Sequence, residues 1–214
     1  MRREGDDPLP GCIPREELGI APKIFLTGDP GCGKTTVLRR IVERLRGSVR
    51  MTGFLTEEVR EGARRSGFRG VTLDGREFPL ARAGGHGPYR IGPYAVSIDG
   101  LEAVGVPALS PAPEIQLVVL DEVGKMESFS AAFRDAVLGL LAGDVPFLAT
   151  VAVHGVGFPK KVRHDPRIVL IRMSRESRGA VVGELLRMLA DAGIGPGTGG
   201  ARAATLPGLR ARAR

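Results

Sequence analysis

The stretch KIFLTGDPGCGKTTVLRRI, residues 23–41, decides the fold expected for this chain. It opens with a short apolar run typical of a buried strand and breaks into a glycine-rich turn, after which apolar residues recur at helical spacing. Strand, turn and helix in this order are the setting of a phosphate-binding P-loop, the Walker A pattern. Glycines allow successive backbone N–H groups to face an anion at the positive end of the helix dipole. The stretch therefore predicts a nucleoside triphosphate site.

Each position of the loop has an expected role in that site. Lys34 is expected to reach the β- and γ-phosphates, and the Thr35 hydroxyl is expected to hold Mg²⁺. Backbone N–H groups along the turn would neutralise the phosphate charge. The loop residues assigned to nucleotide binding are Gly28, Asp29, Pro30, Gly31, Cys32, Gly33, Lys34, Thr35 and Thr36.

Length and composition set the outer limits. A chain of 214 residues with 43% hydrophobic content can form one α/β domain with a substantial core. No apolar run approaches the roughly 18 residues of a membrane span, and residues 1–12 lack an apolar signal region. Cys12 and Cys32 are interpreted as free thiols in a reducing compartment. We therefore expect a cytoplasmic monomer with no membrane segment.

The net charge of +7 raises the question of nucleic acid as a partner. Part of the excess lies in four C-terminal arginines, Arg202, Arg210, Arg212 and Arg214, which have no acidic neighbours. Aromatic residues make up only 5% of the chain and do not interleave with basic runs, so stacking platforms for single strands are not indicated. An anionic nucleotide substrate and a solvated basic surface are favoured over nucleic-acid binding.

The expected fold is a three-layer α/β P-loop domain with a mostly parallel central sheet. Residues 1–22 are interpreted as a flexible leader, 23–192 as the P-loop domain and 193–214 as a disordered tail rich in glycine, alanine and arginine. Within the domain, short glycine-punctuated runs and an Asp-Gly turn at 74–75 predict an antiparallel β insertion over about 50–109.

The remaining elements follow from periodicity. The first helix is expected to end near Arg46 and Gly47. Apolar runs predict core strands at 115–120, 146–153 and 167–173. Ser128 is expected to cap a helix, and a last helix is expected over 176–192.

A second motif, LVVLDE at 117–122, resembles a buried parallel strand whose carboxyl end opens at a ligand crevice. Asp121 is expected to contact Mg²⁺ through a water molecule, because a small hard cation keeps part of its hydration shell. Glu122 is expected to orient and deprotonate the attacking water. With Lys34 it forms the predicted catalytic pair.

Four stretches, 23–45, 53–68, 117–133 and 146–153, resemble the archaeal, bacterial and animal nucleoside-triphosphatases known as the thermostable or cancer-related NTPase family. DEVGKME at 121–127 and GFLTEE at 53–58 carry most of the specificity. The resemblance covers roughly residues 23–178. It implies a small P-loop fold and Mg²⁺-dependent hydrolysis of ATP, GTP and other triphosphates to diphosphate, with broad base tolerance.

The chain departs from the family near its C-terminal end. An Asn-Arg-Asp triplet is usual there, and this chain has Ser177-Arg178-Gly179. Arg178 is a candidate nucleotide-binding residue, and the alternative interpretation is a solvated residue in the first turn of a helix. The roles of two further sets of basic residues remain open. Lys125 is expected either to contact the γ-phosphate or to pair with Glu122 or Glu127. Lys160, Lys161 and Arg163 either supply a charge-stabilising group or form a basic surface loop.

Three alternatives to a hydrolase of free nucleotides remain at this stage. A small-molecule or polynucleotide kinase would use the same loop and acidic pair, with 83–93 as a candidate lid. A nucleotide-binding regulatory module would bind with little turnover, and a nucleic-acid-dependent ATPase would show steep salt dependence. The sequence does not choose between water and a substrate hydroxyl as acceptor, because both require the same in-line geometry.

Overall fold

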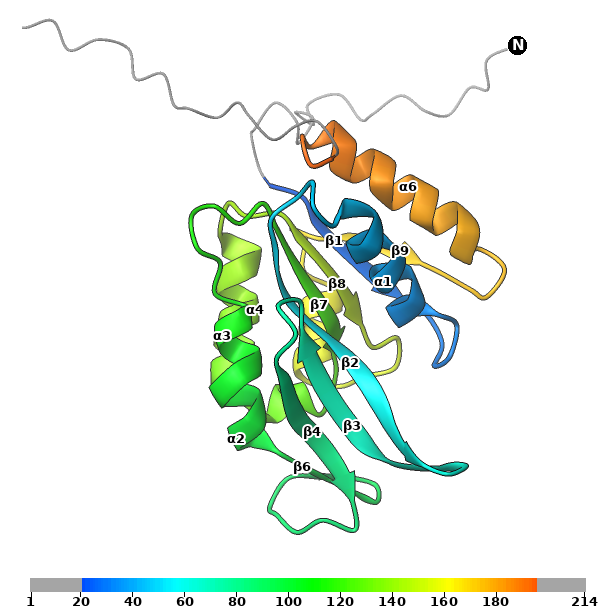
Figure 1. The fold of residues 1–214 in the computed structure, drawn as a ribbon, viewed down its shortest axis with the longest axis vertical. Coiled ribbons are helices and arrows are strands. Elements are labelled where there is room, and N and C mark those ends of the chain that lie inside the picture. The colour runs from blue at the N-terminus through cyan, green and yellow to red at the C-terminus, as the bar shows by residue number, and fades with distance from the viewer. Residues whose placement is uncertain (1–20, 196–214) are drawn as a thin grey trace, which may run out of the picture.

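A nine-stranded sheet organises residues 21–195, which are the residues that the computed structural model describes (Figure 1). Its strand order is β5-β6-β4-β3-β2-β7-β8-β1-β9. The bounds are β1 Lys23–Thr27, β2 Met51–Glu61, β3 Arg64–Thr72, β4 Glu77–Ala83, β5 Arg90–Ile91, β6 Tyr94–Val96, β7 Leu117–Val123, β8 Phe147–Val151 and β9 Val169–Arg172. The strands from β2 to β9 in this order pair in parallel, and the others pair antiparallel.

Helices cover both faces of the parallel part of the sheet (Figure 1). Their bounds are α1 Lys34–Leu45, α2 Ile98–Gly100, the π-helical η1 Leu101–Gly105, α3 Val106–Ala108, the 3₁₀ turn η2 Glu127–Phe129, α4 Ala131–Ala142, α5 Phe158–Arg163 and α6 Arg178–Asp191. One apolar core lies under α1 and α6, and the other lies under α4 and the segment 98–109. The predicted three-layer α/β class is confirmed.

The apolar patterns explain which strands are central. β1 and β8 are buried along their whole length, and β7 is buried at every position except Glu122. Such two-sided burial is what near-continuous apolar runs indicate in a parallel sheet. The parallel strands bring their carboxyl ends to one edge, so the turn after β1 and the acids of β7 meet there.

The first helix agrees with its sequence pattern. Its buried residues Val37, Leu38, Ile41, Val42 and Leu45 form the stripe expected at a period of 3.6. The helix ends before Arg46, and Gly47 adopts a left-handed φ of 81°, as expected for glycine after a helix.

The expected antiparallel β insertion is present, because β2, β3, β4, β6 and β5 pair antiparallel, but it departs from the prediction in two details. First, β2 pairs in parallel with β7 over Met51–Phe54 before it pairs antiparallel with β3, so β3, β4, β6 and β5 extend the central sheet itself. We call these four strands the β extension. Second, residues 98–108 are helical. Glycines and Pro107 mask this helix in the sequence, but Leu101 is fully buried in the second core and Ser97 caps the first turn.

Two smaller expectations were also wrong. The cap of α4 is Ser130, whose Oγ accepts from Phe133 N at 3.0 Å, whereas Ser128 Oγ donates back to Gly124 O. The predicted core strand at 167–173 is the edge strand β9, and Val169 and Leu170 are exposed. Edge position and cap choice depend on neighbouring elements, which the local pattern does not contain.

The expected leader and tail lie almost entirely outside the described residues. In 21–195, no helix has the length and apolar character required to cross a membrane. Cys32 is a free, buried thiol, and Cys12 lies outside the described part of the chain.

Candidate nucleotide site

The loop between β1 and α1 has the backbone conformation that its glycines allow. Gly31 and Gly33 have φ values of 75° and 103°, in the left-handed region that disfavours side chains. A Cβ on Gly28 would lie 2.4 Å from Met173 O, so this position also has no room for a side chain. No side chain caps the N-terminus of α1, so its first N–H groups remain available to an anion.

Lys34 lies against this loop. Its Nζ donates to Gly28 O at 2.9 Å, and the residue is the first of α1. The ammonium group is therefore held over the turn whose N–H groups would bind phosphate. Cys32, by contrast, is 4% exposed and contributes its backbone while its thiol packs into the first core.

Asp121 is the centre of a buried hydroxyl and carboxylate cluster. Thr35 Oγ1 donates to Asp121 Oδ2 at 2.5 Å, and Thr150 Oγ1 donates to Oδ1 at 2.5 Å. Thr56 Oγ1 donates to the Asp121 backbone oxygen at 2.5 Å. Four elements, α1, β2, β7 and β8, thus fix one residue that is 3% exposed. Burial raises the pKa of Asp121, and the two side-chain hydroxyl bonds oppose that rise.

Two further carboxyl groups converge beside Asp121. A Cβ on Gly124 would lie 3.1 Å from Glu122 Oε1 and 2.8 Å from Glu127 Oε2, so both side chains border this glycine. Burial, and then the charge of Asp121, raises the pKa of Glu122. Burial, and then the charge of Glu122, raises the pKa of Glu127 to about 8. The structure therefore holds three acids together on β7 and the turn that follows it.

Glu127 was not predicted as a site residue. Its side chain is buried, with the residue 4% exposed, although Glu is rarely buried without a partner. Backbone N–H groups of Gly124 and of Glu127 itself lower its pKa against the larger effect of burial. The only sequence signal was its place in the DEVGKME stretch.

Arg178 packs against the phosphate loop at Gly33. Its Cδ lies 2.4 Å from where a Gly33 Cβ would stand, and its Nε donates to Arg175 O at 3.0 Å. Arg175 also approaches the loop, with Nη2 3.7 Å from a Cβ position on Gly31. Arg175, in the turn before α6, and Arg178, the first residue of α6, thus both lie beside the phosphate loop, and the sequence had assigned only Arg178 to it.

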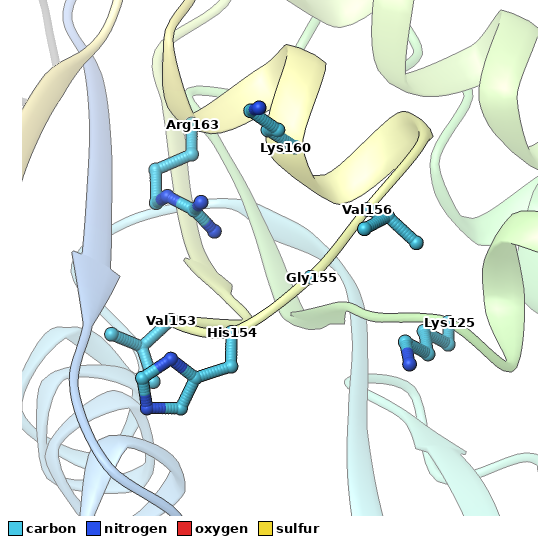
Figure 2. A pocket seen from close by; sticks show the side chains of 7 residues that line it. All are labelled: Lys125, Val153, His154, Gly155, Val156, Lys160 and Arg163. Atoms are coloured by element: carbon cyan, nitrogen blue, oxygen red, sulfur yellow. The ribbon is translucent and has the colours of Figure 1, made fainter.

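Lys125 and Arg163 both line a basic hollow beyond the ends of β7 and β8 (Figure 2). Lys160 also lines this hollow, whereas Lys161 does not. Among residues 21–195, Lys125 forms no ion pair with Glu122 or Glu127, which excludes one of its two expected roles.

The GFLTEE stretch mainly connects the helix and strands that surround the site. Glu57 accepts from Arg39 Nη2 at 2.7 Å and from Arg69 Nη2 at 2.9 Å, which connects α1 to β2 and β3. These hydrogen bonds, that from Arg69 first, lower the pKa of Glu57.

The strand, glycine turn and helix, with an acid-bearing strand one position removed in the sheet, define the class of P-loop nucleotide-binding proteins. Within that class the chain belongs to the NTPase family, whose sequence profile matches residues 23–186.

Similar proteins extend over most of the chain. Nucleoside-triphosphatase THEP1 of Thermotoga maritima is 38% identical over 168 residues, covering 78% of this chain and 95% of that protein. Human cancer-related nucleoside-triphosphatase is 36% identical over 183 residues, with coverages of 78% and 96%. The crystal structure of THEP1 from Aquifex aeolicus aligns with a TM-score of 0.71 and 35% identity, over 78% of this chain and 98% of that one. The resemblance indicated by the motifs is confirmed.

Proposed function

We propose that this chain is a Mg²⁺-dependent nucleoside-triphosphatase that hydrolyses ATP, GTP and other triphosphates to diphosphate and phosphate, with broad base tolerance. The observation that carries the proposal is the Asp121 cluster, which joins a loop threonine to the acid-bearing strand. Family membership supports hydrolysis in general, and the geometry supports the metal and the residue roles.

The residues present fit Mg²⁺. Thr35 Oγ1 and Asp121 Oδ2 are 2.5 Å apart, and hydroxyl and carboxylate oxygens are the hard ligands that Mg²⁺ prefers. Thr35 and Asp121 would hold the ion, directly or through water. When bound, the ion would neutralise negative charge on the phosphate groups.

The chain's own groups account for the other requirements of phosphoryl transfer. The loop N–H groups and the Lys34 ammonium are positioned to bind the phosphates. Glu122 follows Asp121 directly and its carboxyl group borders Gly124, so it is placed to orient a water molecule and accept its proton. Glu122 is half-buried, which leaves access for that water.

The residues that border the loop support broad base tolerance. The chain has no Asn-Lys-x-Asp sequence, the guanine-reading pattern, so specific GTP selection is not supported. Arg175 and Arg178 are two basic residues next to the loop, and a guanidinium group contacts phosphate, ribose or the face of any base. We further propose that the enzyme acts as a cytoplasmic monomer on free nucleotides.

The test is phosphate release from ATP, GTP, CTP and UTP, with Mg²⁺ and with excess EDTA, in the absence of any acceptor. Turnover of all four that requires Mg²⁺ is expected. The Lys34→Ala protein, purified identically, controls for contaminating phosphatases. Tight nucleotide binding without phosphate release would contradict the proposed hydrolase function. It would indicate that the enzyme transfers the phosphoryl group to an acceptor other than water.

A further inference from the structure

The basic hollow lies beside the phosphate loop and is lined by residues that the proposed hydrolysis mechanism does not use. It has a volume of about 450 Å³ and lies between the turn after β7, the end of β8 and helix α5 (Figure 2). Its lining residues are Lys125, Val153, His154, Gly155, Val156, Lys160 and Arg163. It adjoins the phosphate loop, because His154 Nε2 lies 3.7 Å from Asp29 Oδ1.

The lining carries positive charge that the protein does not neutralise. Lys125, Lys160 and Arg163 come from two different segments, and no acidic residue is among the lining residues. In the described part of the chain none of the three forms a salt bridge, whereas Arg60, Arg65 and Arg69 of β2 and β3 are paired with glutamates. A concave surface with charge of one sign concentrates ligands of the opposite sign.

One of these cations is held in a fixed position. Arg163 Nη1 donates to Ala152 O at 2.6 Å, and Ala152 N donates to Val123 O at 3.4 Å, so the guanidinium is tied to the ends of β8 and β7. Figure 2 shows the side chains of Arg163 and Lys125 on opposite sides of the hollow. A preorganised guanidinium facing an ammonium across a hollow suits a phosphate group.

The size and the apolar part of the lining indicate more than a bare phosphate ion. A volume near 450 Å³ falls within the range of about 300–1,000 Å³ found for small-molecule sites. Val156 is 74% exposed and Val153 borders the same space, so an organic group bound beside the cations would cover apolar surface. The lining thus combines an anion site with a small apolar contact area.

We propose that this basic hollow is a second ligand site of the enzyme, which binds a small phosphomonoester while nucleotide occupies the phosphate loop. Lys125, Lys160 and Arg163 contact the phosphate group, and Val153 and Val156 contact the organic part. The inference rests on the proposed function only in that the loop holds the nucleotide. Inorganic phosphate, the product of hydrolysis, shares the anion chemistry and is the competing occupant.

The experiment measures binding without turnover. Protein saturated with Mg²⁺ and ADP is titrated calorimetrically at low salt with ribose 5-phosphate, and separately with inorganic phosphate. Ribose 5-phosphate is expected to bind more tightly than phosphate, because only the ester has an organic part. Equal or tighter binding of phosphate would overturn the phosphomonoester and leave a product-phosphate site. Absence of binding by both ligands would overturn the site altogether.

Charge-matched variants test the location. Lys160→Gln and Lys125→Gln each remove one lining cation and are expected to weaken ribose 5-phosphate binding roughly tenfold. Lys161→Gln removes the same charge from the adjacent residue, which is exposed and outside the lining, and is expected to weaken binding less than about twofold. Equal losses in Lys160→Gln and Lys161→Gln would show diffuse attraction to net charge and overturn the hollow as the site.

The two proposals fail in distinguishable ways. ADP binding is measured first on each protein, and its loss would concern the phosphate loop and the proposed function. Normal ADP binding and normal phosphate release, combined with no ribose 5-phosphate binding, would refute the second site alone.

Discussion

Two groups of acidic residues in this molecule have opposite surroundings. In the site, Asp121, Glu122 and Glu127 lie on β7 and its following turn, without a salt bridge in the described chain, and their pKa values are raised by burial. At the base of the β extension, Glu57 accepts hydrogen bonds from Arg69 and Arg39, and its pKa is lowered.

This difference shows which carboxyl groups are available to bind a metal ion or a proton. A carboxylate paired with arginine is neutralised and has no remaining preference for a metal ion or a water proton. A buried carboxyl group without a cation stabilises whatever positive charge or proton arrives. The acids of β7 and of the turn after it are therefore suited to chemistry, and Glu57 of β2 is suited to joining α1 and β3 to its own strand. Substitutions that exchange one carboxyl for its amide test this comparison directly.

The largest effect is expected where the site's own cation is removed. Lys34→Ala should lower kcat/KM for ATP by about 1,000-fold or more, because a preorganised charge on the transferring phosphoryl group is lost. Phosphate release gives the rate, and a thermal melt establishes that the variant is folded. A folded variant within tenfold of the wild type would remove Lys34 from the mechanism.

Glu122→Gln is expected to separate binding from chemistry. The amide keeps the shape of the side chain but does not accept a proton from water, so kcat should fall by about 100-fold or more. Nucleotide affinity, measured by fluorescence of a labelled ATP analogue, should remain within about threefold. Wild-type turnover in this variant would show that a group other than Glu122 acts as the base.

Glu127→Gln is expected to change the pH dependence of stability. The folded protein keeps a proton on Glu127 up to a pKa of about 8, whereas the unfolded chain releases it near 4.5. The folded state thus binds more protons between these values, and the free energy of unfolding of the wild type should fall as pH rises from about 5 to about 8. The amide mimics the protonated acid and should reduce that fall by about 3 kcal/mol.

Urea denaturation at pH 5.5 and at pH 8.5 measures this effect. Glu43→Gln, an exposed change of the same kind on α1, provides the control and should keep the wild-type slope. Identical pH dependence in the Glu127 variant and the wild type would mean that Glu127 is ionised in the folded protein at neutral pH.

The smallest effect is expected at Glu57, on β2 beside the β extension. Glu57→Gln breaks ion pairs whose arginines are 42% and 44% exposed, so it should cost less than about 1 kcal/mol of stability. Turnover should change less than about twofold, because Glu57 contacts neither the loop nor Asp121. A large loss of turnover with normal stability would show that the GFLTEE stretch acts in catalysis.

The sequence predicted most of the phosphate loop because its signal is local. Glycine φ values, strand apolarity and helix period all act within a few residues, and Gly31, Gly33 and the α1 stripe agree with them. The convergence of Asp121 and Glu122 with the loop was also predictable, since carboxyl ends of parallel strands share one edge.

What the sequence did not predict depends on contacts between distant elements. Lys23 is 2% exposed in β1, and its Nζ donates to Gly143 O and Val145 O, acceptors that no local pattern reveals. Thr150 and Thr56 became site residues only because β8 and β2 flank β7. Arg175 and the burial of Glu127 likewise follow from packing, and the helix at 98–108 forms against the second core despite its glycines.

The buried thiol of Cys32 allows opening of the phosphate loop to be measured chemically. A thiol 4% exposed reacts with a maleimide or disulfide reagent only when the surrounding backbone opens. In a Cys12→Ser background, the alkylation rate of Cys32 therefore records how often residues 28–33 leave their folded arrangement. Any ligand that orders the turn slows that rate, so each nucleotide can be ranked by the protection it gives, without radioactive or coupled assays.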